Sequence, residues 1–373
     1  MFLMTVLSSI LMLDTGENEF PLLTFAGALQ DTDNMRGLLF EQVLDVTFPL
    51  SGYGCLVQNE TQGPEEDATC RMMTTRDLIS AQIVLPGEAA ENTMEHGDTS
   101  QMSETNITPE KTAFIPADRQ VQIDLTQLTD YETLVSNFYA IDANTMAGSD
   151  QLNIDKLMGM DMTLPQDRET PQILIYHTHS QETFADSVPG DVTTGIVGVG
   201  EYLAKILTEQ YGYQVIHHTG QYDAETRDNA YSRALPEIER ILSENPSLQI
   251  VIDLHRDEVA QGTRLVTEIE GRPTARFMFF NGLSRTRKTG DIDYLYNENQ
   301  EANLAFSFQM QLKAAEYYPG LTRRIYLKGY RYNMHLRPRT LLVELGAQNN
   351  TLEEAKNACD PLAHILDMVL RGA

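Results

Sequence analysis

Between residues 173 and 254 the sequence alternates short apolar runs with longer segments of helical periodicity, and this rhythm constrains the fold most strongly. The apolar runs at 173–176, 213–217 and 249–254 are continuous, as in strands buried on both faces. The segments at 197–211 and 224–242 have the spacing of amphipathic helices. Strand, helix, strand, helix, strand predicts an α/β fold with a mostly parallel, twisted sheet flanked by helices.

The rest of the C-terminal region continues this pattern. A hairpin is predicted from strands at 263–270 and 274–280. Further segments read as a helix at 297–317, strands at 324–327 and 340–345, and a last helix at 351–370. Ahead of these, 134–142 reads as a helix leading into a loop. In open sheets of this kind, sites form at the carboxyl ends of strands, so the functional residues are expected there.

Charge divides the chain near Pro171. The whole chain has 54 acidic and 27 basic residues, a net charge of −27. Residues 1–171 hold 28 acids and 7 bases, a net of −21, and residues 172–373 hold 26 and 20, a net of −6. This argues against a nucleic-acid binder or a simple anionic-membrane binder, since phosphates favour clustered cations. Seven of the eight histidines follow Pro171, so imidazole chemistry is expected there.

An acidic, partly flexible region at 1–127 is expected ahead of a domain at 128–373. Residues 1–13 are apolar, but they are shorter than the ~18 residues of a spanning helix and lack a preceding basic segment. A clipped anchor and a buried helix both fit them. Residues 88–111 have the composition of a flexible linker. Cys55 and Cys70 could close one loop in an oxidising compartment, and whether they pair is left open.

Residues able to bind a metal or move a proton follow three of the predicted strands. His179 follows the first, His255 the third, and Glu344 ends the strand at 340–345. His179 and Glu182 form an H-x-x-E pair, which lets an imidazole and a carboxylate reach one metal ion. Zinc hydrolases need such ligands, an open position for water and a carboxylate to take its proton. His179, Glu182 and His255, with Glu344 as the base, supply that set.

Other polar residues have two interpretations each. If the strand persists through Thr178, His177 and His179 face the same way; if the chain turns, only one reaches the site. His335 either contacts substrate or hydrogen-bonds a loop.

Asp253 and the pair that follows His255 are similarly open. Asp253 either orients His255 or forms a hydrogen bond at the edge of the sheet. Arg256 and Asp257 form an ion pair that either lines the cleft or is purely structural.

Four segments in order resemble the stage II sporulation protein P (SpoIIP) family of spore-forming Firmicutes. They are LVSNFYAIDANTM (134–146), ILIYHTHSQETFADS (173–187), VIDLHRDE (251–258) and YNMHLRPRTLLVELGAQNNTLEEA (332–355). The resemblance covers residues 128–370.

The resemblance implies a zinc-dependent peptidoglycan hydrolase with a zinc amidase-like fold. Such proteins resemble N-acetylmuramoyl-L-alanine amidases and also act as endopeptidases on cross-linked stems. It further implies an extracytoplasmic protein tethered to the membrane at the sporulation septum during engulfment. The implied partners are a lytic transglycosylase (SpoIID-like) and a membrane protein (SpoIIM-like). Family members usually begin with an anchor, of which this chain has only the 13-residue apolar start.

The resemblance also assigns roles. The two zinc histidines fall on His179 and His255, and the late glutamate, general base and acid, falls on Glu344. The ligand carboxylate is left between Glu182 and Glu201, with Glu182 chemically closer.

Arg256, or the strand backbone, is the candidate for steadying the oxyanion, and His335 and His177 are the candidate substrate contacts. Two alternatives are kept: a zinc carboxypeptidase, and a non-catalytic wall-binding scaffold in which the histidines serve packing.

Overall fold

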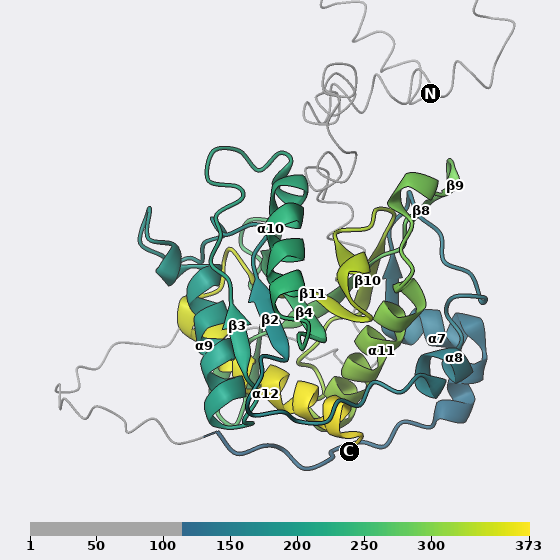
Figure 1. The fold of residues 1–373 in the computed structure, drawn as a ribbon. Helices are drawn as coiled ribbons and strands as arrows, with labels where there is room; N and C mark the ends of the chain where they lie inside the picture. Colours follow the sequence, from purple (N-terminus) through teal and green to yellow (C-terminus); the bar gives the residue numbers. More distant parts are fainter. Residues whose placement is uncertain (1–113) are drawn as a thin grey trace, which may run out of the picture. The chain divides into compact units, whose positions relative to one another are not determined.

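The computed structural model describes residues 114–373, in which a seven-stranded sheet has the order β1-β10-β7-β11-β4-β2-β3 (Figure 1). Its strands are β1 (Tyr139–Ile141), β2 (Ile173–Tyr176), β3 (Val215–His217), β4 (Ile250–Asp257), β7 (Phe277–Gly282), β10 (Ile325–Lys328) and β11 (Arg339–Ala347). Of the six neighbouring pairs, five are parallel and β7 with β11 is antiparallel. The mostly parallel sheet flanked by helices is confirmed.

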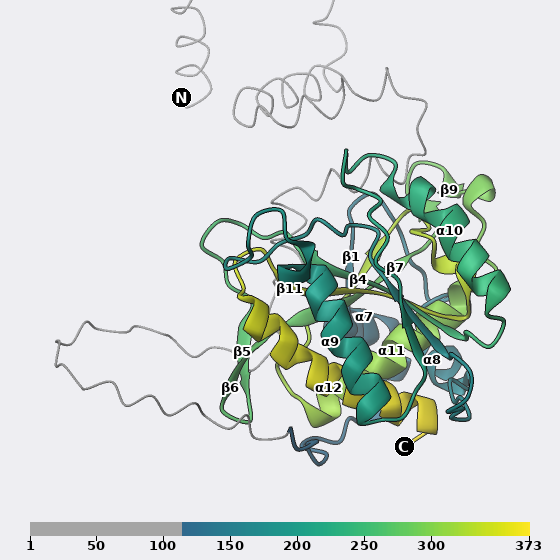
Figure 2. The same ribbon diagram turned by 60° about the vertical axis from the view of Figure 1, so that its left-hand side comes forward.

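Helices cover both faces of this sheet. One face packs against α9 (Ile196–Glu209), α11 (Gln300–Tyr317) and α12 (Leu352–Arg371), and the opposite face against α10 (Ala230–Glu244) (Figure 2). The short helices α7 (Tyr131–Phe138) and α8 (Ile154–Gly159) precede β2 in the chain, and α8 contacts α11.

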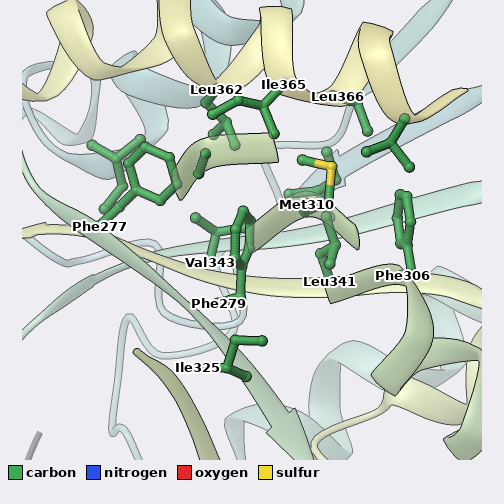
Figure 3. Packing of buried hydrophobic residues seen from close by; sticks show 14 of the residues in the cluster. Phe277, Phe279, Phe306, Met310, Ile325, Leu341, Val343, Leu362, Ile365 and Leu366 are labelled. Atoms are coloured by element: carbon green, nitrogen blue, oxygen red, sulfur yellow. The ribbon is translucent and has the colours of Figure 1, made fainter. Parts of the chain in front are cut away.

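The larger core lies between the sheet and α11 and α12. Phe277 and Phe279 of β7 and Val343 of β11 lie beneath Leu362 and Ile365 of α12 (Figure 3). Side chains alternate between the faces of a strand, so the residues between these core positions point to the α10 side. That side is therefore where the polar residues of β4 and β11 emerge.

The predicted hairpin is present but shorter. Strands β5 (Val266–Ile269) and β6 (Arg272–Ala275) pair across a turn at Glu270 and Gly271, which have φ of 52° and 73°. The second strand was predicted too long, because Phe277 begins β7, which joins the main sheet. All of β7 is buried, as a strand inside a covered sheet requires. A second small hairpin joins β8 (Arg285–Thr286) and β9 (Gly290–Asp291).

Other boundaries also differ from the prediction. Strands β4 and β11 continue past their predicted ends at 254 and 345, so His255 and Glu344 lie inside strands rather than at strand ends. Helix α10 begins at Ala230 rather than at 224, because Asn229 takes a left-handed conformation with φ 60° that a helix cannot include. The predicted helix at 134–142 ends at Phe138, and β1 follows it as an edge strand. Three residues at a sheet edge are too few for a recognisable period.

The last helix begins with a capping box. Thr351 accepts the Glu354 N–H, and the Glu354 side chain accepts the Thr351 N–H, a capping box. The predictions for the apolar start, the linker and the Cys55–Cys70 pair lie outside the described residues. Across residues 114–373, no helix combines the length and apolarity needed to cross a bilayer.

Candidate active site

Three neighbouring parallel strands bring the main candidate residues together. Glu344 of β11 lies in register with His255 of β4, so both side chains emerge on the face covered by α10. On the other side of β4, β2 leads into the turn that carries His179, whose ring centroid is 5.3 Å from that of His255. His179, His255, Glu344 and Glu182 are all buried.

The chain turns directly after β2, so the two histidines of this segment diverge. His179 faces His255, and burial lowers its pKa. His177 is fully buried elsewhere, with Nδ1 2.7 Å from the Leu254 carbonyl oxygen. The structure therefore agrees with the second interpretation, in which the chain turns and only one histidine, His179, faces the candidate site.

His177 belongs to a separate chain of contacts beneath α9. Its Nε2 lies 2.9 Å from Nε2 of His217, whose Nδ1 lies 3.1 Å from Oε2 of Glu201. Gly200 allows this packing, because a Cβ there would lie 2.5 Å from Nε2 of His177. Burial lowers the pKa of His177 to about 3, so its ring is neutral. Glu201, largely exposed, contacts this chain rather than His255.

Glu182 is the carboxylate that faces His255. Its Oε2 lies 3.5 Å from Nδ1 of His255 and accepts the Arg256 backbone N–H at 2.8 Å. Its Oε1 accepts from Nη2 of Arg227 at 2.8 Å. Burial alone would raise the pKa of Glu182, but His255, Arg227 and Arg256 outweigh it and hold that pKa well below its usual range.

The surroundings favour the charged form of His255 and the neutral form of Glu344. Burial opposes charge on His255, but Asp253 and Glu182 outweigh it and hold its pKa well above the ordinary value. Burial raises the pKa of Glu344 to about 8, and its Oε2 has no hydrogen-bond donor among the described residues. A carboxyl group with a pKa near neutrality is able both to take and to return a proton.

The chain from the end of β3 to the first turn of α10, residues 218–231, adds three residues that were not predicted; it is called the β3–α10 segment below. Besides Arg227, Asp223 places Oδ2 3.7 Å from Nδ1 of His179, and Tyr231 packs its ring against His179 and His255, with centroids 5.7 and 6.5 Å away. No sequence signal marked them, because Arg227 and Tyr231 fall within the predicted helix at 224–242, Asp223 directly precedes it, and all three lie far along the chain from His179 and Glu182.

Asp253 contacts His255 and also accepts hydrogen bonds from the turn after β2, so its position fits both interpretations. Its Oδ1 is 2.8 Å from Nε2 of His255, and its carboxylate also accepts the backbone N–H and hydroxyl of Thr178, at 2.9 and 2.6 Å. It therefore links β4 to the turn after β2.

The predicted Arg256–Asp257 ion pair is wrong. The Asp257 carboxylate pairs with Arg323 instead, and the Arg256 guanidinium donates to the carbonyl oxygens of Thr183 and Asp257 at 3.1 and 3.2 Å. Successive residues of a strand point to opposite faces, which separates the two side chains.

His335 lies in the 3-10 turn η5 (Met334–Leu336), before the amino end of β11, whereas Glu344 lies near the carboxyl end. The His335 carbonyl accepts from the Asn299 side chain at 2.7 Å. Its role as a substrate contact stays a prediction.

The buried donors suit zinc in kind, although they are not gathered around one point. Among residues 114–373, no group of three His, Cys, Asp or Glu side chains is arranged to hold a metal ion. Both ring nitrogens of His179 are nevertheless buried without a hydrogen bond. The 3.5 Å between Nδ1 of His255 and Oε2 of Glu182 is close to the roughly 3.4 Å that separates two tetrahedral zinc ligands.

Comparisons with known proteins agree with the sequence resemblance. A family model of stage II sporulation protein P matches residues 69–367. The curated stage II sporulation protein P of Bacillus subtilis (strain 168) is 26% identical over 214 residues, which cover 52% of this chain and 49% of the relative. The chain thus spans about half the length of this relative.

Solved structures of N-acetylmuramoyl-L-alanine amidases are also similar. AmiC2 of Nostoc punctiforme is 14% identical, with a TM-score of 0.34, over 54% of this chain and 97% of the amidase. Ami1 of Mycobacterium smegmatis is 12% identical, with a TM-score of 0.35, over 55% and 99%.

Proposed function

The chain belongs to the stage II sporulation protein P family, and on this premise we propose that it is a peptidoglycan hydrolase of sporulation. The bond it cleaves is the amide between N-acetylmuramic acid and the L-alanine of the stem peptide.

The observation that supports this proposal is the grouping of Glu344, His179 and Glu182 around His255. Amide hydrolysis needs one group to take a proton from the attacking water and to return it to the leaving nitrogen. Glu344 suits this role, because it is buried and its Oε2 is not engaged by another residue of the described chain. It lies in register with His255, which faces His179 and Glu182, and all three are residues of the types that bind zinc.

His179, Glu182 and His255 would hold the zinc ion. When bound there, zinc supplies Lewis acidity for the scissile carbonyl and lowers the pKa of a water molecule to about 7. The protein's contribution is orientation: Arg227 and the Arg256 N–H hold the two oxygens of Glu182.

The proposal extends to a second bond and to a location. The enzyme also cleaves cross-linked stems as an endopeptidase. It works outside the cytoplasm, tethered at the sporulation septum, with a lytic transglycosylase (SpoIID-like) and a membrane protein (SpoIIM-like). Arg256 and His335 stay proposed contacts for the substrate or its oxyanion, whereas His177 does not, because it is fully buried with its ring nitrogens on Leu254 and His217. Family membership supports these points.

Digestion of purified sacculi, followed by mass spectrometry of the soluble products, tests the reaction. We expect intact stem peptides that begin with L-alanine, no products in chelator, and recovery on adding zinc. Release of single C-terminal amino acids would indicate a carboxypeptidase instead. Binding to sacculi without soluble fragments would indicate a scaffold.

A pair of histidine variants tests the ligand assignment in the same assay. His255→Ala should lose both zinc and turnover. His364→Ala is the matched control, because His364 lies in α12 and contacts Tyr318. Full zinc content and full activity in His255→Ala would remove His255 from the metal site.

A further inference from the structure

Each candidate histidine ligand has a buried carboxylate beside one of its ring nitrogens. Oδ1 of Asp253 lies 2.8 Å from Nε2 of His255, and Oδ2 of Asp223 lies 3.7 Å from Nδ1 of His179. The other nitrogens have different surroundings. Nδ1 of His255 faces Glu182 at 3.5 Å, and Nε2 of His179 is buried without a hydrogen bond.

Neighbouring groups hold both aspartates in place. Asp253 accepts the N–H and hydroxyl of Thr178, at 2.9 and 2.6 Å. Asp223 accepts the Ser180 hydroxyl at 2.8 Å and the Gln181 N–H at 3.3 Å. All of these donors belong to the turn that carries His179, so the carboxylates are fixed relative to that ligand.

We propose that Asp253 and Asp223 are positioning residues, which decide that His255 offers Nδ1 and His179 offers Nε2 to the metal. A carboxylate favours the imidazole tautomer whose N–H points toward it, and this leaves the lone pair on the other nitrogen. The same contact makes the ligand nitrogen more basic. This inference rests on the proposed function, since it concerns the zinc ion assigned there.

Neither contact is an aligned hydrogen bond, since Nε2 of His255 and Nδ1 of His179 make no hydrogen bond. Hydrogen bonds of active sites are often long or poorly aligned before the site is filled. We therefore expect metal binding to tighten both contacts.

Zinc affinity of the full chain, measured by competition with a chromophoric chelator, tests the role of each carboxylate. Asp253→Asn and Asp223→Asn keep the side-chain shape but remove the charge, and each should weaken zinc binding roughly 10–100-fold. Asp142→Asn is the matched control, because Asp142 is equally buried but accepts from Tyr326 and Asn144 near β1. Affinities equal to the control would overturn the proposal.

Nitrogen-15 NMR of the zinc-loaded wild-type protein tests the tautomers without any variant. We expect the shifts of a coordinated Nδ1 and a protonated Nε2 for His255, and the reverse for His179. Coordination through the opposite nitrogens would overturn the inference. Absence of zinc binding would overturn both this inference and the zinc site of the proposed function. Zinc bound as expected without amidase products would sustain the inference and contradict the proposed reaction.

Discussion

Glu344 is distinguished from an ordinary buried glutamate by its surroundings. It lies in register with His255, and burial raises the pKa of its carboxyl group to about 8. Glu344→Gln is nearly isosteric with the protonated acid, so zinc content and melting temperature should be kept. Proton transfer should be lost, which predicts a decrease in muropeptide turnover of roughly 10²–10⁴-fold. Zinc content, melting temperature and turnover are to be measured on one sample.

Glu354 provides the comparison, because it caps α12 and accepts from Arg264. Glu354→Gln should lower the melting temperature and leave turnover per folded molecule largely intact. Zinc loss in Glu344→Gln would make Glu344 a ligand, and undiminished turnover would remove it from the mechanism.

The lowered pKa of His335 predicts how the stability of the protein depends on pH. Burial, together with repulsion from Arg331, lowers its pKa to about 4 from an ordinary 6.5. Between these values the unfolded chain binds a proton that the folded protein does not, so its contribution to stability is present above pH 6.5 and is lost toward pH 4. The melting temperature of His335→Gln should therefore fall less than that of the wild type between pH 7 and 4.5. Parallel curves for the two proteins would contradict this assignment.

At the scale of elements, α9 is fitted closely to the strands beneath it. A Cβ on Gly200 would lie 2.5 Å from Nε2 of His177 and 2.7 Å from Nε2 of His217, inside normal contact distance. Gly200→Ala should destabilise the fold by about 1–3 kcal/mol through overpacking. The usual gain of about 1 kcal/mol for alanine in a helix does not offset this.

Denaturant unfolding measures this difference. Gly159→Ala in α8 is the matched control, since nothing lies within 4 Å of a Cβ there, and it should cause no loss. If Gly200→Ala were as stable as this control, the close packing of α9 on His177 would be wrong.

At the scale of the whole molecule, residues 114–127 pack against elements of the later chain. The N–H groups of Gln120 and Val121 donate to the Glu316 carbonyl oxygen at 2.9 and 3.0 Å, and the Phe114 ring stacks on Tyr318. The domain start at 128, as predicted from the sequence, therefore leaves out residues that contact α11. The family match, which begins at residue 69, also starts earlier.

Two fragments test where the catalytic unit starts. Residues 114–373 should keep turnover of soluble muropeptides, because the candidate site lies entirely within them. Residues 128–373 should melt at a lower temperature, because the fragment lacks the contacts to Glu316 and Tyr318. Equal melting temperatures would show that residues 114–127 contribute nothing to stability. Loss of turnover in folded, zinc-loaded 114–373 would show that earlier residues take part in the chemistry.

The order and type of most elements can be read from the sequence, as can the strands that carry the candidate site. Buried strands and amphipathic helices are local patterns, and carboxyl ends of neighbouring parallel strands meet at one edge of a sheet. For this reason the sequence points to His179, His255 and Glu344, and the H-x-x-E spacing adds Glu182. The helix at 351–370 is also predicted from the sequence, and the structure adds a capping box formed by Thr351 and Glu354.

Long-range packing sets the strand order, the reversed direction of β7 against β11, and the side of the sheet to which each histidine turns. It also brought Asp223, Arg227 and Tyr231 from the β3–α10 segment to His179 and Glu182. These contacts join residues some 40 or more positions apart, and no local period encodes them. Two local features also appear only in the structure: Asn229 is left-handed, which shortens α10, and Gly200 of α9 packs against His177 and His217.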